Sequence, residues 1–156
     1  MSYSDLFNEM CVNLLLEGYG VRFRAGGASM HPNIRDGEVI TVESLRGEKV
    51  SVGDILLYRT DRGVIAHRVE RIDNAQSETV YFFRGDSALS CDKPVEAPRV
   101  LGKVVAVERQ GKTIRLGGRT NKLIHKAASV AFRLKQRLST GGARRKLLYG
   151  KAADLL

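Results

Sequence analysis

The sequence predicts a mainly β protein in which antiparallel strands coil into a partly open barrel. We expect an N-terminal amphipathic helix and a basic C-terminal helical tail to flank this barrel. Two observations predict the architecture. Residues 19–118 consist of short alternating apolar segments separated by turn residues, without helices between them. Residues 1–18 and 119–156 instead carry apolar residues at helical spacing. These three ranges are the predicted parts of the chain.

The composition fits one globular domain. The chain has 156 residues, of which 43% are hydrophobic and 28% charged, and these values exclude a wholly disordered chain. No segment approaches the roughly 18 apolar residues of a membrane-spanning helix. Asp5 and Glu9 stand where a secretory signal peptide would be basic. Because Cys11 and Cys91 do not form a disulfide framework, we expect a cytoplasmic protein, with peripheral membrane contact as an option for the tail.

The first segment, residues 4–17, is predicted to be a helix that ends at Gly18. Its apolar residues recur at the i, i+3, i+4, i+7 spacing that places side chains on one helix face. This face contains Phe7, Met10, Cys11, Leu14 and Leu15. We expect it to pack on the β body.

Six or seven short strands are predicted between residues 21 and 116. They cover 21–24, 39–42, 55–58, 64–69, 80–84, 100–109 and 112–116. Turn residues precede several of them, and Gln110-Gly111 predicts a tight hairpin between the last two. Strands joined in this way favour an antiparallel sheet.

The tail from residue 119 carries the whole net charge of the chain. It contains ten Lys and Arg against one acid, a net charge of +9, whereas the rest of the chain has 16 bases and 16 acids. Its predicted apolar stripe contains Leu123, Ala127, Val130, Ala131, Leu134 and Leu138. An apolar stripe beside basic residues is typical of a helix that binds an anionic membrane surface. Alternatively, the stripe packs on the β body and the bases are merely solvated. Nucleic acid is a weaker candidate, since only Phe132 and Tyr149 could stack on bases.

Three clusters in the β body contain residues that could carry chemistry. The first is Gly27-Ala28-Ser29-Met30-His31-Pro32, a loop that would expose a serine hydroxyl. The second places His67 in an apolar strand, and neutral histidine is a suitable base for activating serine near pH 7. The third supplies Asp86 and Asp92, carboxylates that could orient an imidazole. Taken singly, each cluster also has an ordinary structural explanation as a loop, a packed histidine or a turn.

The order of five short motifs resembles the signal peptidase I family. They are Gly-x-Ser-Met-x-Pro, Gly-Asp-Ile-Leu-Leu-Tyr-Arg, His-Arg-Val, Arg-Gly-Asp with a second Asp, and Val-Leu-Gly-Lys-Val-Val. The resemblance covers about residues 21–107. It is closest to the archaeal and endoplasmic-reticulum branch, in which histidine stands where the bacterial enzymes have lysine. The implied fold is the coiled β sheet of signal peptidases and LexA-like proteins.

The resemblance implies a role for each matched residue. Ser29 would be the nucleophile, His67 the general base and Asp92 the carboxylate that orients His67, with Asp86 structural or supporting. The backbone N–H of Ser29 and a neighbouring donor would hold the oxyanion. The residues expected to bind substrate or form the oxyanion hole are Gly27, Ala28, Met30 and Pro32. Gly27 stands where many relatives have a serine, so that side-chain donor is missing. The implied mechanism uses no cofactor and no metal.

The sequence therefore predicts a serine endopeptidase that cleaves a peptide or protein precursor through an acyl-enzyme. We expect the extended substrate to lie along a sheet edge near Ser29. The alternative is a catalytically silent peptide-binding or regulatory module that docks through its basic tail. LexA-like autoproteases are disfavoured because they use a lysine base, and because Ala25-Gly26 lies too close to Ser29 to be a self-cleavage site. The chain also departs from the family in carrying an amphipathic helix where signal peptidases have a membrane anchor.

Overall fold

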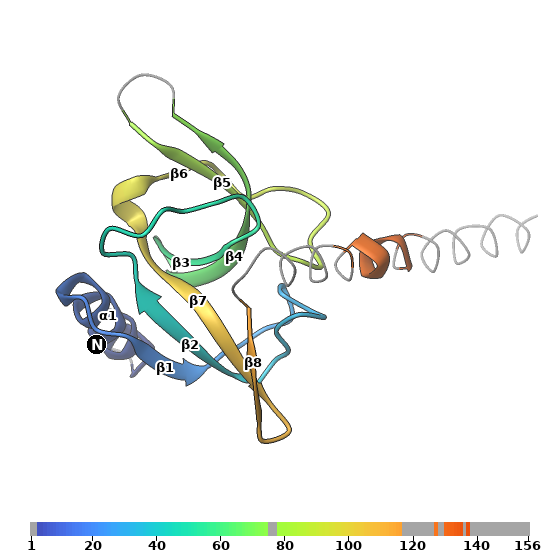
Figure 1. The fold of residues 1–156 in the computed structure, drawn as a ribbon, viewed down its shortest axis with the longest axis horizontal. Helices are drawn as coiled ribbons and strands as arrows, with labels where there is room; N and C mark the ends of the chain where they lie inside the picture. The colour runs from blue at the N-terminus through green and yellow to red at the C-terminus, as the bar shows by residue number, and fades with distance from the viewer. Residues whose placement is uncertain (1–2, 75–77, 117–126, 128–129, 136, 138–156) are drawn as a thin grey trace, which may run out of the picture.

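One antiparallel sheet of eight strands, which does not close on itself, forms the body of the protein (Figure 1). The computed structural model describes residues 3–74, 78–116, 127, 130–135 and 137. The elements are α1 (Tyr3–Glu17), β1 (Val21–Arg24), β2 (Val39–Ser44), β3 (Ile55–Thr60), β4 (Gly63–Asp73), β5 (Val80–Arg84), β6 (Val95–Glu96), a 3-10 turn (Ala97–Arg99), β7 (Val100–Arg109) and β8 (Lys112–Arg115). The predicted mainly β class is confirmed.

The strands lie where the alternating segments predict them, with one addition. β6 has only two residues, Val95 and Glu96, which pair with the start of β5. A two-residue strand is too short to produce an alternating pattern, and it therefore has no recognisable sequence pattern. The predicted hairpin between β7 and β8 is present, with Gln110 at φ 51° and Gly111 at φ 73°. Two consecutive positive φ values are typical of the tight turn that suits twisted strands.

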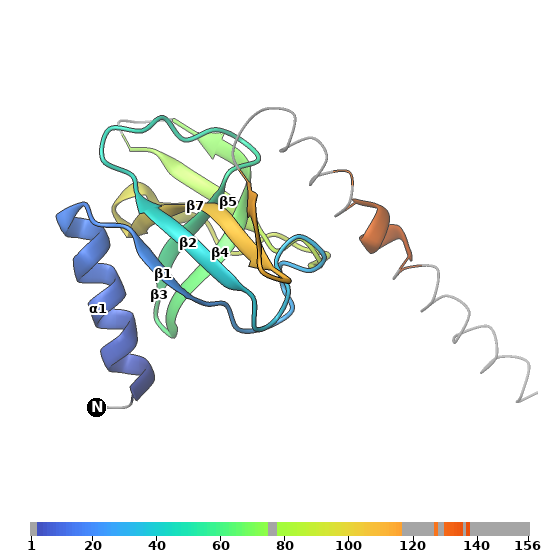
Figure 2. The same cartoon turned by 60° about the horizontal axis from the view of Figure 1, so that its bottom comes forward.

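β7 organises the sheet because it pairs with three strands. The strand order is β1-β2-β7-β3-β4-β5-β6, and β8 pairs with β7 beside β3. β3 pairs with the first part of β7 and β8 with the last part. β7 therefore lies inside the sheet (Figure 2), with β2 along one edge and β3 and β8 along the other. Two apolar clusters form the core, one around Ile40, Val42 and Leu57 and a smaller one around Tyr58 and Phe83.

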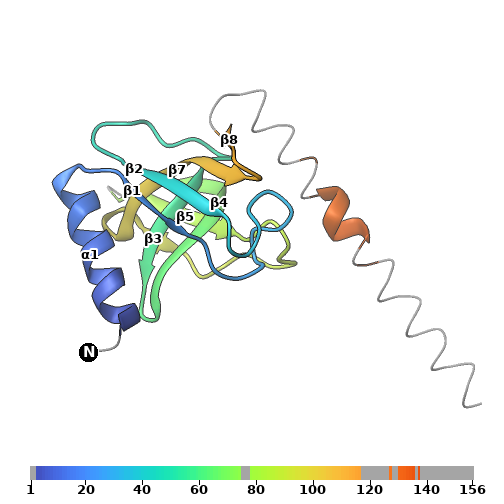
Figure 3. The same cartoon turned by 90° about the horizontal axis from the view of Figure 1, so that it is seen from below.

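Helix α1 lies along one side of the sheet (Figure 3), where it contacts β1, β2, β4 and β7. It ends as predicted: the N–H of Gly18 donates to Leu15 and that of Tyr19 to Leu14, which is the hydrogen-bond pattern of a glycine-terminated helix. Cys11 and Leu15 are buried as expected.

One residue on the predicted face of α1 is placed wrongly. Met10 is 52% exposed, whereas Val12, which the prediction omitted, is buried. The reason is geometric. The buried stripe is centred on Cys11 and Leu15, and successive residues are about 100° apart around a helix, so Met10 turns outward. A single helix packed on a sheet buries a narrower stripe than its apolar spacing suggests.

The described part of the tail is helical and lies across the body from α1, as the orange segment in Figure 1. Ala127, Val130, Ala131 and Leu134, four members of the predicted apolar stripe, are exposed. These four residues therefore do not pack on the β body. Leu123 and Leu138, the ends of the stripe, lie outside the described residues. Among the residues described, no helix is long and apolar enough to cross a membrane.

Candidate active site

The loop between β1 and β2 presents Ser29 at the surface. Gly27 has φ 91°, and its N–H donates to Asp36 Oδ1 at 2.8 Å, which fixes the start of the loop. Met30 is buried in the larger core cluster, and its carbonyl accepts the N–H of Ile34. Because both neighbouring segments are anchored in this way, the exposed Ser29 between them is held in place.

His67 lies on β4, opposite Leu56 of β3, and is buried apart from its edge toward the loop. Its Nε2 is 2.9 Å from Ser29 Oγ. Its Nδ1 is 2.5 Å from Asp92 Oδ2. The imidazole thus contacts a hydroxyl through Nε2 and a carboxylate through Nδ1, and the Tyr58 hydroxyl lies 3.4 Å from Nδ1. The structure brings these three residues together from positions 29, 67 and 92.

Asp92 lies in the loop between β5 and β6. Its backbone N–H donates to the carbonyl of Phe83 at 2.8 Å, which ties this loop to β5. The Tyr58 hydroxyl donates to Asp92 Oδ2 at 2.8 Å, the same oxygen that contacts His67. Burial, followed by the hydrogen bond and the charge of Asp92, raises the pKa of Tyr58 well above its usual value, so the hydroxyl keeps its proton.

Asp86 does not contact His67. Its carboxylate, 1% exposed, accepts two hydrogen bonds from Arg68, at 2.7 and 2.8 Å, and one from Asn33 at 2.7 Å. Arg68 also donates to the carbonyl of Gly53. This buried group connects the loop after β1 with β4 and the segment after β5. Its geometry is that of a structural clamp beneath the site.

The residues around Asp86 also hold the backbone of Ser29. The Ser87 N–H donates to the Ser29 carbonyl at 2.9 Å, and the Ser87 hydroxyl contacts the carbonyls of Ala28 and Ser29. A Cβ on Gly85 would lie 2.7 Å from the Ser29 carbonyl and 3.2 Å from His67 Nε2. Only glycine leaves this space free. Neither Gly85 nor Ser87 was predicted to belong to the site. The available signal was their position on either side of Asp86.

A cavity of about 350 Å³ adjoins Ser29 and His67. Its lining is mostly apolar and contains Phe23, Ala25, Met30, Ile34, Leu57, Val64, Ile65 and Ala66. Of the four residues predicted for substrate or oxyanion binding, Gly27 and Met30 line this cavity, whereas Ala28 and Pro32 lie outside its lining. The carbonyl of Pro32 instead accepts a hydrogen bond from Arg109.

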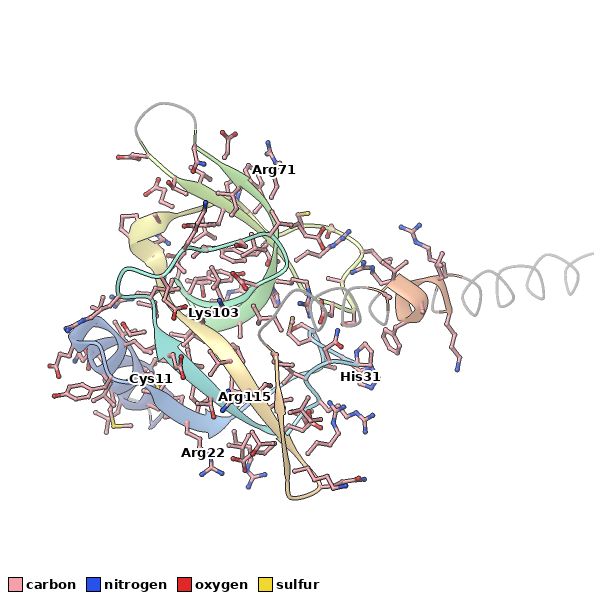
Figure 4. The ribbon with its side chains drawn as sticks, in the orientation of Figure 1. Cys11, Arg22, His31, Arg71, Lys103 and Arg115 are labelled. Carbon is pink, nitrogen blue, oxygen red and sulfur yellow. The ribbon has the colours of Figure 1, made fainter. Side chains whose placement is uncertain are left out.

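The described part of the tail touches the loops that carry the site. The ring of Phe132 packs on His31 with a centroid distance of 4.6 Å, and Arg133 donates to the carbonyl of Asp86 at 3.2 Å. Figure 4 shows His31 beside the orange segment. The helical period did not predict this contact, because Phe132 lies off the apolar stripe.

The geometry has the arrangement needed for nucleophilic chemistry: a hydroxyl, a base in contact with it, and a carboxylate that orients the base. An apolar cavity lies next to the hydroxyl. No family model, no curated protein and no solved structure matches the chain.

Proposed function

We propose that the protein is a serine endopeptidase of the signal peptidase type, acting on a peptide or protein precursor. The observation that carries the proposal is the contact of His67 with Ser29 on one ring nitrogen and with Asp92 on the other. The open antiparallel sheet and the order of the sequence motifs support the same family of folds.

In the proposed reaction, His67 Nε2 takes the proton of the Ser29 hydroxyl while Oγ bonds to the carbonyl carbon of the substrate. The imidazolium keeps its Nδ1 proton, which forms a hydrogen bond to the Asp92 carboxylate and so stabilises the positive charge. His67 next returns the Nε2 proton to the leaving amine, the peptide C–N bond breaks, and an acyl-enzyme remains. A water molecule, deprotonated by His67, hydrolyses the ester and restores Ser29.

The oxyanion of the tetrahedral intermediate needs backbone donors near Ser29. The N–H of Gly27 is already bonded to Asp36, which makes it a poor candidate. We therefore assign the N–H of Ser29 itself as the main donor, in a loop fixed from below by Ser87. A donor held in place before the reaction stabilises the developing charge without a cost of reorganisation.

Among the described residues, two unpaired strand edges support binding of an extended peptide. β1 ends the strand order, and residues 63–67 of β4 pair with β3 alone because β5 begins to pair at Arg68. Residues from both edges, Phe23 and Val64 among them, line the cavity beside Ser29. A peptide strand added to either edge would place alternate side chains in an apolar cavity and its backbone next to the serine.

The test is cleavage of a peptide library by the full chain, read by mass spectrometry. We expect cleavage by the wild type and by Ser51→Ala, a control in an exposed turn, but none by Ser29→Ala. Peptide binding without Ser29-dependent cleavage would overturn the proposal in favour of a silent binding module.

We further propose that the tail contacts an anionic membrane. The exposed stripe in its described part, with Leu134 54% exposed, lies beside the exposed Lys135 and Arg137. Sedimentation with vesicles tests this contact. We expect the full chain to bind vesicles containing phosphatidylserine, to release at high salt, and to lose binding on Val130→Glu with Leu134→Glu. Equal sedimentation of wild type and variant would overturn the membrane assignment.

A further inference from the structure

Tyr58 is the residue beside the site for which neither the motif order nor the reaction gives a role. It lies on β3, is 2% exposed and stacks on Phe83 with a centroid distance of 4.3 Å and an interplanar angle of 8°. Its ring is therefore an ordinary member of the smaller core cluster. Its hydroxyl is not ordinary, because it ends at the carboxylate of Asp92.

The hydroxyl lies within reach of both charged members of the site. It is 2.8 Å from Asp92 Oδ2 and 3.4 Å from His67 Nδ1. The strand register explains this placement: Leu56 pairs with His67 and Tyr58 with Ile65, so Tyr58 and His67 are diagonal neighbours on one face of the β3–β4 hairpin. One carboxylate oxygen thus accepts from the imidazole and from the phenol together.

Tyr58 is held more firmly in the structure than Asp92 is. Tyr58 is buried on a central strand, while Asp92 lies in a loop with its side chain 32% exposed. An exposed carboxylate can rotate and exchange its partner for water, and a buried phenol can do neither. Phe83 reinforces the contact, since its ring stacks on Tyr58 and its carbonyl holds the Asp92 N–H.

We propose that Tyr58 is a positioning residue, whose hydroxyl fixes the Asp92 carboxylate so that it accepts the hydrogen bond from His67 Nδ1–H. The inference rests on the proposed function and adds a fourth member to its hydrogen-bonded chain. Because the raised pKa keeps the phenol protonated, the donor is present wherever a histidine base is neutral. A fixed acceptor stabilises the imidazolium formed in the transition state more than the neutral ring of the ground state.

Tyr58→Phe tests the proposal because it removes the hydroxyl and keeps the stacked ring. On a peptide cleaved by the wild type, we expect kcat to fall about 10- to 100-fold with little change in KM, the loss typical of one hydrogen bond to a charged group. Tyr81→Phe is the matched control, since Tyr81, on the same strand β5 as Phe83, also stacks on the Phe83 ring, with a centroid distance of 6.0 Å. It should keep wild-type kcat.

A double-mutant cycle separates positioning from packing. If Tyr58 acts through Asp92, Tyr58→Phe should have no further effect on kcat in an Asp92→Ala background. A full additional loss in that background would overturn the proposal. So would wild-type kcat in Tyr58→Phe.

A spectroscopic measurement makes the inference independent of turnover. The low-field proton NMR resonance of His67 Nδ1–H reports its bond to Asp92. We expect this resonance to shift or broaden in Tyr58→Phe and to stay unchanged in Tyr81→Phe. If the wild type shows no Ser29-dependent cleavage, the proposed function fails, while the resonance still decides whether Tyr58 orders Asp92. An unchanged resonance in Tyr58→Phe overturns the inference in either case.

Discussion

His67 and Arg68 are consecutive residues of β4, and each contacts an aspartate from the segment after β5, yet the two pairs have opposite environments. His67 meets Asp92 at the edge of the cavity, where the carboxylate is partly exposed. Arg68 meets Asp86 beneath the site, where both side chains are almost fully buried. The difference arises because neighbouring residues on a strand point to opposite faces of the sheet.

This comparison separates the chemical role from the structural one. A buried ion pair is stable only if its hydrogen bonds are satisfied, and Asp86 meets this condition with three bonds from Arg68 and Asn33. Such a group cannot reach a substrate. Asp92 has one side open and contacts the imidazole that touches Ser29. Both residues are aspartates, and what distinguishes them is how far each carboxylate is exposed.

The largest expected effect concerns Ser29 and His67, which both line the cavity. Ser29→Ala and His67→Ala should each lower kcat/KM by a factor on the order of 10⁵, because hydroxyl and base act as one unit. The double variant should be no worse than either single one, and circular dichroism should show an unchanged fold. A double variant far less active than both single ones would contradict the assignment of His67 as the base.

The next effect distinguishes the two aspartates by turnover. Asp92→Asn should lower kcat on the order of 10³-fold, because an amide does not stabilise the imidazolium as a carboxylate does. Asp86→Asn should lower kcat far less per folded molecule, since Asp86 does not touch His67. Steady-state kinetics normalised to the folded fraction measures both. Equal losses, or a larger loss in Asp86→Asn, would exchange the roles.

Stability should show the reverse order. Asp86→Asn leaves Arg68 buried beside an uncharged partner, and we expect the free energy of unfolding to fall by about 3–5 kcal/mol. Asp92→Asn, at a partly exposed position, should lower it by less than about 1 kcal/mol. Urea denaturation of the two variants gives both values. If Asp92→Asn were the more destabilising, the buried clamp would not be the structural member of the comparison.

Most of the sheet could be predicted from the sequence because its signals are local. Alternating apolar residues and the Gln110-Gly111 turn marked strands that the structure contains. β6 was missed because two residues make no period. The exposure of Met10 was missed because it depends on where α1 rests on the sheet, which is a tertiary property.

The same difference between local signals and tertiary properties applies to the residues of the candidate site. Ser29, His67, Asp86 and Asp92 were selected from motifs that are short and local in the chain. Tyr58 belonged to one of those motifs, but its meaning depends on the β3–β4 register, which brings it diagonal to His67. Phe132 contacts His31 across a gap of about 100 residues. No spacing rule along the chain could have found that contact.

The smallest expected effect is on the pH dependence of the free energy of unfolding. It concerns Tyr58, whose buried hydroxyl donates to Asp92. Burial and the neighbouring Asp92 raise the pKa of Tyr58 in the folded protein, while an unfolded tyrosine titrates near 10. Above about pH 10 the folded state therefore holds a proton that the unfolded state has lost. Stability must then fall as pH rises, by up to about 1.4 kcal/mol per pH unit for one such group, and be insensitive to this group below pH 10.

Tyr58→Phe isolates this contribution, because lysines and other tyrosines titrate in the same range and are common to both proteins. We expect the difference in unfolding free energy between wild type and Tyr58→Phe to be constant from pH 7 to 9 and to shrink between pH 10 and 11. Burial also raises the pKa of Tyr81, so Tyr81→Phe should show a smaller change of the same sign. A constant difference through pH 11 for Tyr58→Phe would mean that this phenol ionises in the folded state as it does in water. The Tyr58 hydroxyl would then not be a buried donor to Asp92, and it would not link the partly exposed Asp92 to the buried core.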